Sequence, residues 1–179
     1  MRKKKKEKQF RESFWAALFS TVGPVNLDEQ PTHLEHARMR LWDRVEDEHL
    51  ELMVTHIRSI NMLDLDETDI TNDGIEHLTR LDLLKELRLK GIRQLDNGCI
   101  VHLDKLKGLE LLHIKGTSIT LDGVLKLNNL EGLKQLFFSD DEDKPAREKM
   151  LQLREVLPGC EFIINGRPYD FEDEQDYYH

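Results

Sequence analysis

The sequence has few of the residues that build disulfide frameworks, metal centres or membrane spans. Its 179 residues include only two cysteines, Cys99 and Cys160, too few for a disulfide framework or a cysteine-based four-ligand zinc site. Aromatic residues make up 7% of the chain. No apolar run reaches the ~18–20 residues that a membrane-spanning helix needs. We therefore expect no structural metal, no cofactor and no transmembrane helix.

Catalytic motifs are also missing. The chain has no H-E-x-x-H motif, Walker loop, dinucleotide fingerprint or G-x-S-x-G turn. His33 and His36 lie three residues apart and flank Glu35, but no cysteine–histidine cluster supports them as metal ligands. Surface or structural histidines are the simpler interpretation. The sequence therefore predicts a protein that is not an enzyme and binds no metal.

Charge is unevenly distributed along the chain, whose formal net charge is −9. Residues 1–13 hold seven basic and two acidic residues, a net charge of +5, which leaves −14 for the remainder. Phosphate contacts dominate the affinity of proteins for nucleic acid. The acidic body is therefore not expected to bind nucleic acid.

A repeat of 24 to 25 residues follows. The motif L-x-x-L-x-L, with Ile or Phe in some leucine positions, occurs four times, and its middle leucine is Leu63, Leu87, Leu112 and Leu136. Apolar residues then recur at helical spacing, as at Ile75, Leu78 and Leu81. A unit of strand, turn and helix cannot bury its apolar face alone, so neighbouring units stack over one continuous core. The sequence predicts a short α/β solenoid with a parallel β-sheet.

The segment after the strand carries a family resemblance. Residues 68–78 and 117–127 both read T-x-I-T-x-x-G-I/V-x-x-L. Together with L-x-x-L-x-L, this pattern resembles the 24-residue bacterial leucine-rich repeats related to the cysteine-containing class, over about residues 57–165. The resemblance implies a right-handed leucine-rich-repeat solenoid and a protein-binding role. Residues 90–95 of the second repeat depart from it because they lack the Thr-x-Ile-Thr segment.

The N-terminal end of the solenoid needs a cap. For residues 32–57 we predict a largely helical N-terminal cap, because Thr32 and Glu35 form a capping box after Pro31. A degenerate first repeat, with its strand at residues 39–42, is the alternative.

The repeat domain is predicted to span residues 58–168 and to end in a strand cap. Cys160 lies 24 residues after Leu136, so we expect it to fill a leucine position as a small buried apolar residue. Residues 169–179 are predicted to form a solvated acidic tail.

Residues 1–31 are predicted to form a basic amphipathic arm. After a run of lysines, apolar residues recur every four positions, and a tryptophan lies next to one of them. The residues of the arm are Lys3, Lys4, Lys5, Lys6, Phe10, Phe14, Trp15 and Leu18. Such a helix can lie on anionic lipid, dock on a partner or fold back as a cap, and the sequence does not separate these three roles. A secretory signal is disfavoured because no A-x-A-like cleavage site follows the apolar stretch.

Side chains beside the buried leucines should project from the concave sheet face, because strand residues alternate between the two faces. The central row is expected to hold Asp64, Arg88, His113, Phe137 and Glu161. Aromatic and arginine side chains dominate binding energy at protein interfaces. We therefore predict a partner-binding surface made of Asp64, Arg88, Lys90, Leu111, His113, Lys115 and Phe137.

These patterns predict a cytoplasmic, non-enzymatic protein-binding module that binds through its concave face. One concrete form is a bacterial immunity or adaptor protein. Two alternatives remain: a peripheral membrane scaffold recruited to an anionic surface by the basic helix, and an RNA-associated factor that uses the lysine arm.

Overall fold

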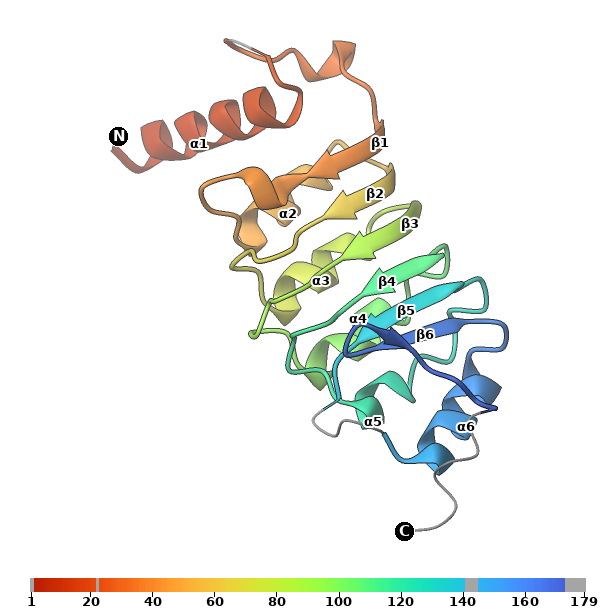
Figure 1. The fold of residues 1–179 in the computed structure, drawn as a ribbon. Helices are drawn as coiled ribbons and strands as arrows, with labels where there is room; N and C mark the ends of the chain where they lie inside the picture. The colour runs from red at the N-terminus through yellow and green to blue at the C-terminus, as the bar shows by residue number, and fades with distance from the viewer. Residues whose placement is uncertain (1, 22, 141–144, 173–179) are drawn as a thin grey trace.

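The computed structural model describes residues 2–21, 23–140 and 145–172. It has an α/β fold with one open seven-stranded sheet whose strands follow one another in sequence order (Figure 1). Each of the first five strands pairs in parallel with the next, and β7 pairs antiparallel with β6. The strands are β1 (His33–Arg38), β2 (Ser59–Asp64), β3 (Leu83–Arg88), β4 (Leu111–His113), β5 (Gln135–Phe138), β6 (Glu161–Ile164) and β7 (Arg167–Pro168). The predicted α/β class and parallel sheet are confirmed.

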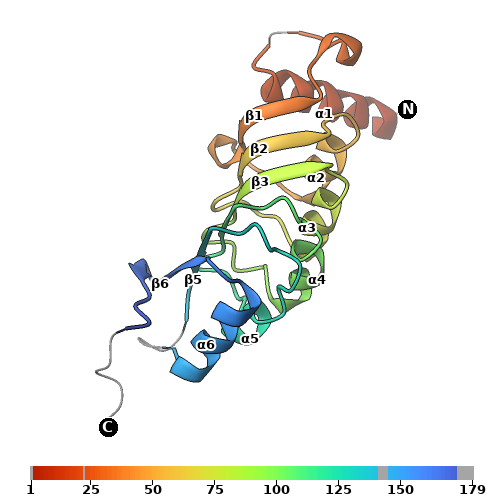
Figure 2. The same cartoon turned by 90° about the vertical axis from the view of Figure 1, so that its right-hand side faces the viewer.

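Short helices connect the parallel strands. They are α2 (Asp47–Met53), α3 (Asn72–Leu78), α4 (Ile100–Leu103), α5 (Leu121–Val124) and α6 (Arg147–Val156), with 3-10 turns η1 (Leu27–Glu29), η2 (Met39–Leu41) and η3 (Asn97–Cys99). Figures 1 and 2 show α2 to α4 along one face of the sheet. The opposite face carries no helix, and we call it the open face.

The leucines of successive units form one aligned layer. Leu63, Leu87, Leu112 and Leu136 are paired neighbours across the sheet, and all are fully buried. The expectation that the repeat leucines are buried and adjacent is confirmed. Each unit therefore contributes the same apolar position to a continuous core.

The last strand is displaced from the expected register. Phe162, not Cys160, pairs with Leu136, and Cys160 is a half-buried residue before β6. The step from Leu136 to Phe162 is 26 residues, two more than the 24 expected, and the connection includes the ten-residue helix α6. Two extra residues shift the strand, so Ile163 pairs with Phe137 and Glu161 pairs with Gln135. The placement of Cys160 in a leucine position and of Glu161 in the central row is therefore wrong.

Residues 32–57 are not largely helical. They begin with β1, and the Thr32 carbonyl accepts a hydrogen bond from the Arg58 amide at 2.7 Å. Glu35, expected to cap a helix, instead accepts a hydrogen bond from Asn61 on β2 at 2.6 Å. The prediction of a largely helical cap over residues 32–57 is therefore wrong. Pairing β1 with the edge of β2 gives hydrogen bonds to more backbone groups than a local capping box does. The domain boundaries themselves stay a prediction.

The helix that covers this end of the sheet is α1 (Arg2–Leu18), from the predicted basic arm (Figure 2). Phe14 and Trp15 are 3% and 4% exposed. The Phe14 ring contacts Trp42 with centroids 5.7 Å apart, and Phe10 contacts His49 at 4.9 Å. Of the three roles left open for the arm, the structure has it folded back on the core. Lys3, Lys4, Lys5 and Lys6 remain exposed, whereas Leu18 packs against the core.

Candidate partner-binding surface

The open face brings most of the predicted binding residues into one row. Asp64, Arg88, His113 and Phe137 are successive partners across β2 to β5, and Ile163 continues the row on β6. We call these five residues the central row. Strands lie about 4.8 Å apart, so neighbouring members of the row are close enough for their side chains to touch.

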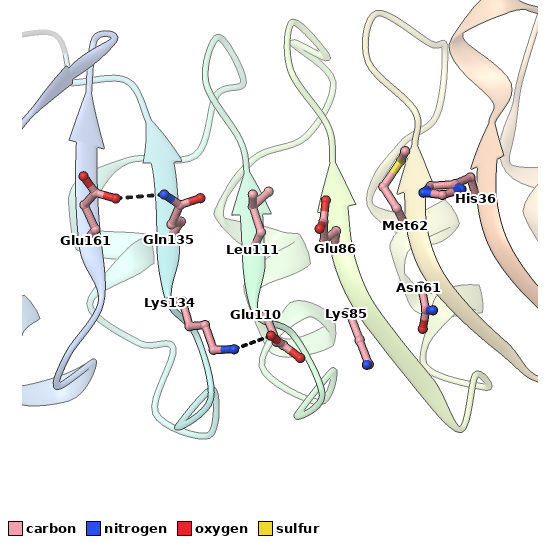
Figure 3. A pocket seen from close by; sticks show the side chains of 10 residues that line it. All are labelled: His36, Asn61, Met62, Lys85, Glu86, Glu110, Leu111, Lys134, Gln135 and Glu161. Atoms are coloured by element: carbon pink, nitrogen blue, oxygen red, sulfur yellow. Dashed lines mark hydrogen bonds and ion pairs between the residues drawn. The ribbon is translucent and has the colours of Figure 1, made fainter.

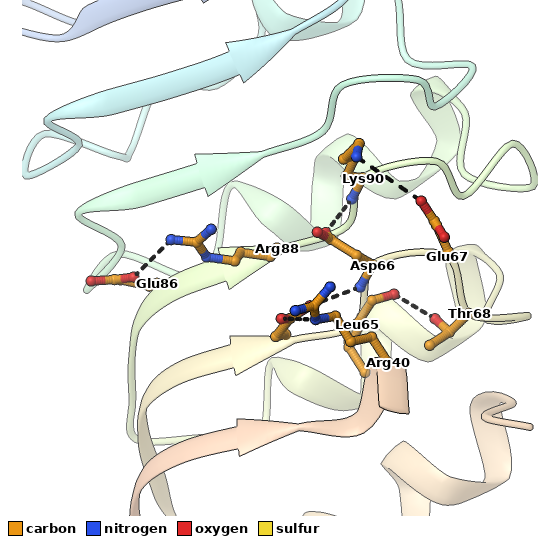
Figure 4. Close-up of polar contacts among 9 residues, drawn as sticks. Arg40, Leu65, Asp66, Glu67, Thr68, Glu86, Arg88 and Lys90 are labelled. Carbon is orange, nitrogen blue, oxygen red and sulfur yellow. Dashed lines mark hydrogen bonds and ion pairs between the residues drawn. The ribbon is translucent and has the colours of Figure 1, made fainter. Parts of the chain in front are cut away.

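Asp64 is buried on this face and holds neighbouring residues in place, so it is not an exposed contact for a partner. It is 5% exposed. The Arg40 guanidinium lies 2.7 Å from its carboxylate (Nε to Oδ2), and the Asp66 amide donates to its other oxygen at 3.2 Å (Figure 4). Burying a carboxylate is costly unless it is paired and hydrogen-bonded, and both conditions are met here. The sequence analysis missed Arg40; its 24-residue offset from Asp64 is the one signal that could have linked the two.

Asp66 and Lys90 lie beside the central row. The Lys90 amide donates to Asp66 Oδ1 at 2.8 Å, and the Lys90 ammonium lies 4.0 Å from Glu67 (Figure 4). Burial raises the pKa of the Asp66 carboxyl, although the Lys90 amide opposes this. Lys90 is thus exposed but already paired with an acid.

His113 and Phe137 form the aromatic part of the row. Their ring centroids are 4.9 Å apart and their planes are tilted by 51°. Burial lowers the pKa of His113; Asp66 opposes the shift, whereas Arg88, Lys90 and Lys115 add to it. His113 is therefore largely neutral at pH 7 and acts as a flat ring that packs on Phe137.

Arg88 and Lys115 supply positive charge on either side of His113. The Arg88 guanidinium lies 3.7 Å from Glu86, and its Nε is buried with no hydrogen-bond partner within the described residues (Figure 4). Lys115 has no acidic partner in the described part of the chain. The central row and the adjacent Lys115 therefore place two cationic groups near the half-buried Phe137, whereas Ile163 is only 7% exposed.

A second feature of the open face is a groove of about 630 Å³ near the start of the strands (Figure 3). The predicted residue Leu111 lies here, apart from the central row. Lys134 pairs with Glu110 at 2.5 Å, and Gln135 donates to Glu161 at 2.8 Å. Three charged residues of the groove recur at the repeat spacing but were not predicted as site residues: Lys85 within β3, Glu110 just before β4 and Lys134 just before β5.

No group of three or more His, Cys, Asp and Glu side chains in residues 2–21, 23–140 and 145–172 could hold a metal ion. Burial raises the pKa of both Cys99 and Cys160 to about 12, so both thiols are protonated at neutral pH and are weak nucleophiles. Among the described residues, no helix is both long and apolar enough to cross a bilayer.

Comparison with known proteins finds mammalian relatives that share one name. No family model matches the chain. It is 28% identical over 112 residues to ATP synthase subunit s, mitochondrial, of Bos taurus, which covers 59% of this chain and 56% of the relative. The Mus musculus and Homo sapiens proteins of the same name are 27% identical, with the same coverage. The chain thus spans about half the length of the curated relatives it matches.

These relatives correct two expectations from the sequence. The proteins that the chain resembles are mitochondrial and mammalian, so its assignment to the bacterial leucine-rich-repeat proteins is wrong. The function inferred with that assignment is wrong for the same reason. That function was a bacterial immunity or adaptor module, and its alternatives were a lipid-bound scaffold and an RNA-associated factor. A cytoplasmic location has no support from relatives named as mitochondrial.

Proposed function

We propose that this chain is a subunit of a multiprotein complex and that ATP synthase is the complex to test first. The observation that carries the proposal is the similarity to proteins named as mitochondrial ATP synthase subunits over 59% of the chain. We further propose that the chain contributes binding to this complex and is not itself catalytic.

We also infer that the units form a short right-handed solenoid with a strand at its C-terminal end. The parallel pairing of β1 to β6 in sequence order supports this inference, as does the near-constant step between Leu63, Leu87, Leu112 and Leu136. Connections between parallel neighbours in one sheet are right-handed in nearly all known cases.

We place the contact with the complex on the central row. Phe137 is half-buried beside His113, and Arg88 pairs with His113 on the next strand along the row. A partner segment with an acidic group next to an apolar side chain would complement these residues. Aromatic and arginine side chains of this kind are typical of residues that dominate binding energy.

The proposal is tested by reciprocal purification from the native cell. A tagged chain should enrich ATP synthase subunits over a tag-only control, and purification through an ATP synthase subunit should recover the chain at a defined ratio. Enrichment of a different complex in both directions would refute the ATP synthase assignment. Recovery of the chain alone, without any stoichiometric partner, would refute its role as a subunit.

A further inference from the structure

A second surface lies at the β1 end of the sheet, opposite β6. A groove of about 490 Å³ runs between α1 and the segment at residues 24–27. One side of it is α1, where Lys4, Lys8, Arg11 and Trp15 are spaced four, three and four residues apart and Glu7 and Glu12 also line the groove, so that basic residues outnumber acidic ones by three to two. Residues with these spacings lie on one helix face. The other side is apolar and includes Val25 and Leu27.

The groove combines positive charge with apolar surface. Lys8 lies 3.7 Å from Glu12, whereas Lys4 and Arg11 have no acidic partner within the described residues. The surrounding residues 1–13 carry a net charge of +5. Trp15 lines the groove, and its Nε1 is buried with no hydrogen-bond partner among the described residues. A ligand that fits must carry negative charge, apolar side chains and hydrogen-bond acceptors.

The C-terminal segment of the chain has this composition. Residues 172–178 read Glu-Asp-Glu-Gln-Asp-Tyr-Tyr, four acids followed by two aromatic residues. The segment starts from a fixed point, because Phe171 packs on Phe162 and its carbonyl accepts a hydrogen bond from Arg147 at 2.7 Å. Residues 173–179 lie outside the described residues.

The two surfaces are too far apart to meet within one molecule. The sheet separates them, since α1 lies beside β1 and Phe171 lies beside β6 (Figure 1). Five strand spacings of about 4.8 Å amount to ~24 Å. The four residues after Glu172 span at most ~14 Å when fully extended. The acids of the tail can therefore reach an α1 groove only in a second copy.

We propose that the acidic segment 172–178 of one copy docks in the α1 groove of another, so that copies of this chain associate head to tail. The interaction pairs the basic end of one molecule with the acidic end of the next. It uses neither the open face nor any residue of the central row, and it does not depend on the proposed function.

The test is sedimentation equilibrium of the full chain and two variants. The head variant is Lys4→Gln, Lys8→Gln, Arg11→Gln, and the tail variant is Glu172→Gln, Asp173→Asn, Glu174→Gln, Asp176→Asn. The unchanged chain should exceed its monomer mass of 21.1 kDa as concentration rises at low salt, and should approach that mass near 1 M salt. Each variant alone should stay monomeric over the same range.

Mixing the variants provides the decisive comparison. The head variant keeps an intact tail and the tail variant keeps an intact groove, so a 1:1 mixture should form a dimer that cannot extend. A matched control, Lys105→Gln, Lys107→Gln, Lys126→Gln, removes the same charge from exposed positions elsewhere and should associate like the unchanged chain. A monomeric unchanged chain, or association that survives in the tail variant, would overturn the proposal.

A peptide experiment keeps the result independent of variant folding. Both tryptophans, Trp15 and Trp42, lie at the α1 end, so intrinsic fluorescence reports on the groove. A peptide of residues 169–179 should change this fluorescence in the tail variant. An analogue with its acids replaced by amides should bind at least tenfold more weakly. Equal binding of the two peptides, or no response to either, would contradict the proposal.

Discussion

At the scale of single residues, the two faces of the sheet separate stability from binding. Leu112 is fully buried between Leu87 and Leu136, whereas Phe137 is only half-buried on the open face. We predict that Leu112→Ala lowers the free energy of unfolding by about 2–5 kcal/mol through a core cavity, and that Phe137→Ala lowers it much less. Urea unfolding of the two variants measures this difference. Equal losses would mean that Phe137 belongs to the core and not to a binding surface.

The lowered pKa of His113 predicts a pH effect on stability. The folded state disfavours the protonated ring, so below the unfolded pKa of about 6.5 the unfolded chain binds more protons and stability falls as pH falls. Asp66 acts in the opposite direction, because its raised pKa makes the folded state bind more protons above pH ~3.9. Between pH 7.5 and 5.5 the melting temperature should fall less in His113→Gln than in the unchanged chain. An identical fall in both would show that His113 is not the group responsible.

At the scale of the secondary-structure elements, polar side-chain contacts join the starts of α3 and α5 to the previous unit, and we call these contacts the polar ladder. Thr71 donates to Asp47 at 2.6 Å, and Asn97 donates to Thr120 at 2.9 Å. The glycine of each T-x-x-G motif leaves room for this contact, since a Cβ on Gly123 would overlap the Asn97 side chain. The glycine of the motif is therefore explained by the close approach of a side chain from the previous unit.

This ladder gives a prediction with a matched control. We expect Gly123→Ala to destabilise the protein by about 1–3 kcal/mol, because the added methyl group displaces Asn97 from the Thr120 N-cap. Gly132→Ala should be nearly neutral, since its Cβ would lie 3.7 Å from the nearest atom, the Leu109 carbonyl oxygen. Thermal melts of both variants distinguish them. A neutral Gly123→Ala would remove the close-approach explanation.

The elements that repeat could be predicted from the sequence, and those that depend on one tertiary contact could not. The spacing of Leu63, Leu87 and Leu112 determines three strands, because each must face the same core. Strand β1 was not predicted, because its local residues favour a helix and it forms a strand only by pairing with the edge of β2. The role of α1 was equally open, since Phe14 suits lipid, a partner or the core, and the choice depends on Trp42.

At the scale of the whole molecule, the candidate site was predicted in part. Arg88, His113 and Phe137 do lie in one row, because the repeat spacing fixes their register. Asp64 was placed on the surface wrongly, since its partner Arg40 comes from a segment expected to be helical. The identity of the partner complex could not be predicted from the sequence, because a row of surface residues specifies charge and shape but not the protein that matches them.

The most direct test of the account is a photo-crosslink from the open face to the complex. A photoreactive phenylalanine analogue at position 137 is compared with the same analogue at Val101, which is 58% exposed on α4. The account predicts that position 137 crosslinks to an ATP synthase subunit in native membranes and that position 101 does not. Crosslinking from position 101 with none from position 137 would contradict the proposed contact, and the absence of ATP synthase from every crosslink would contradict the proposed complex.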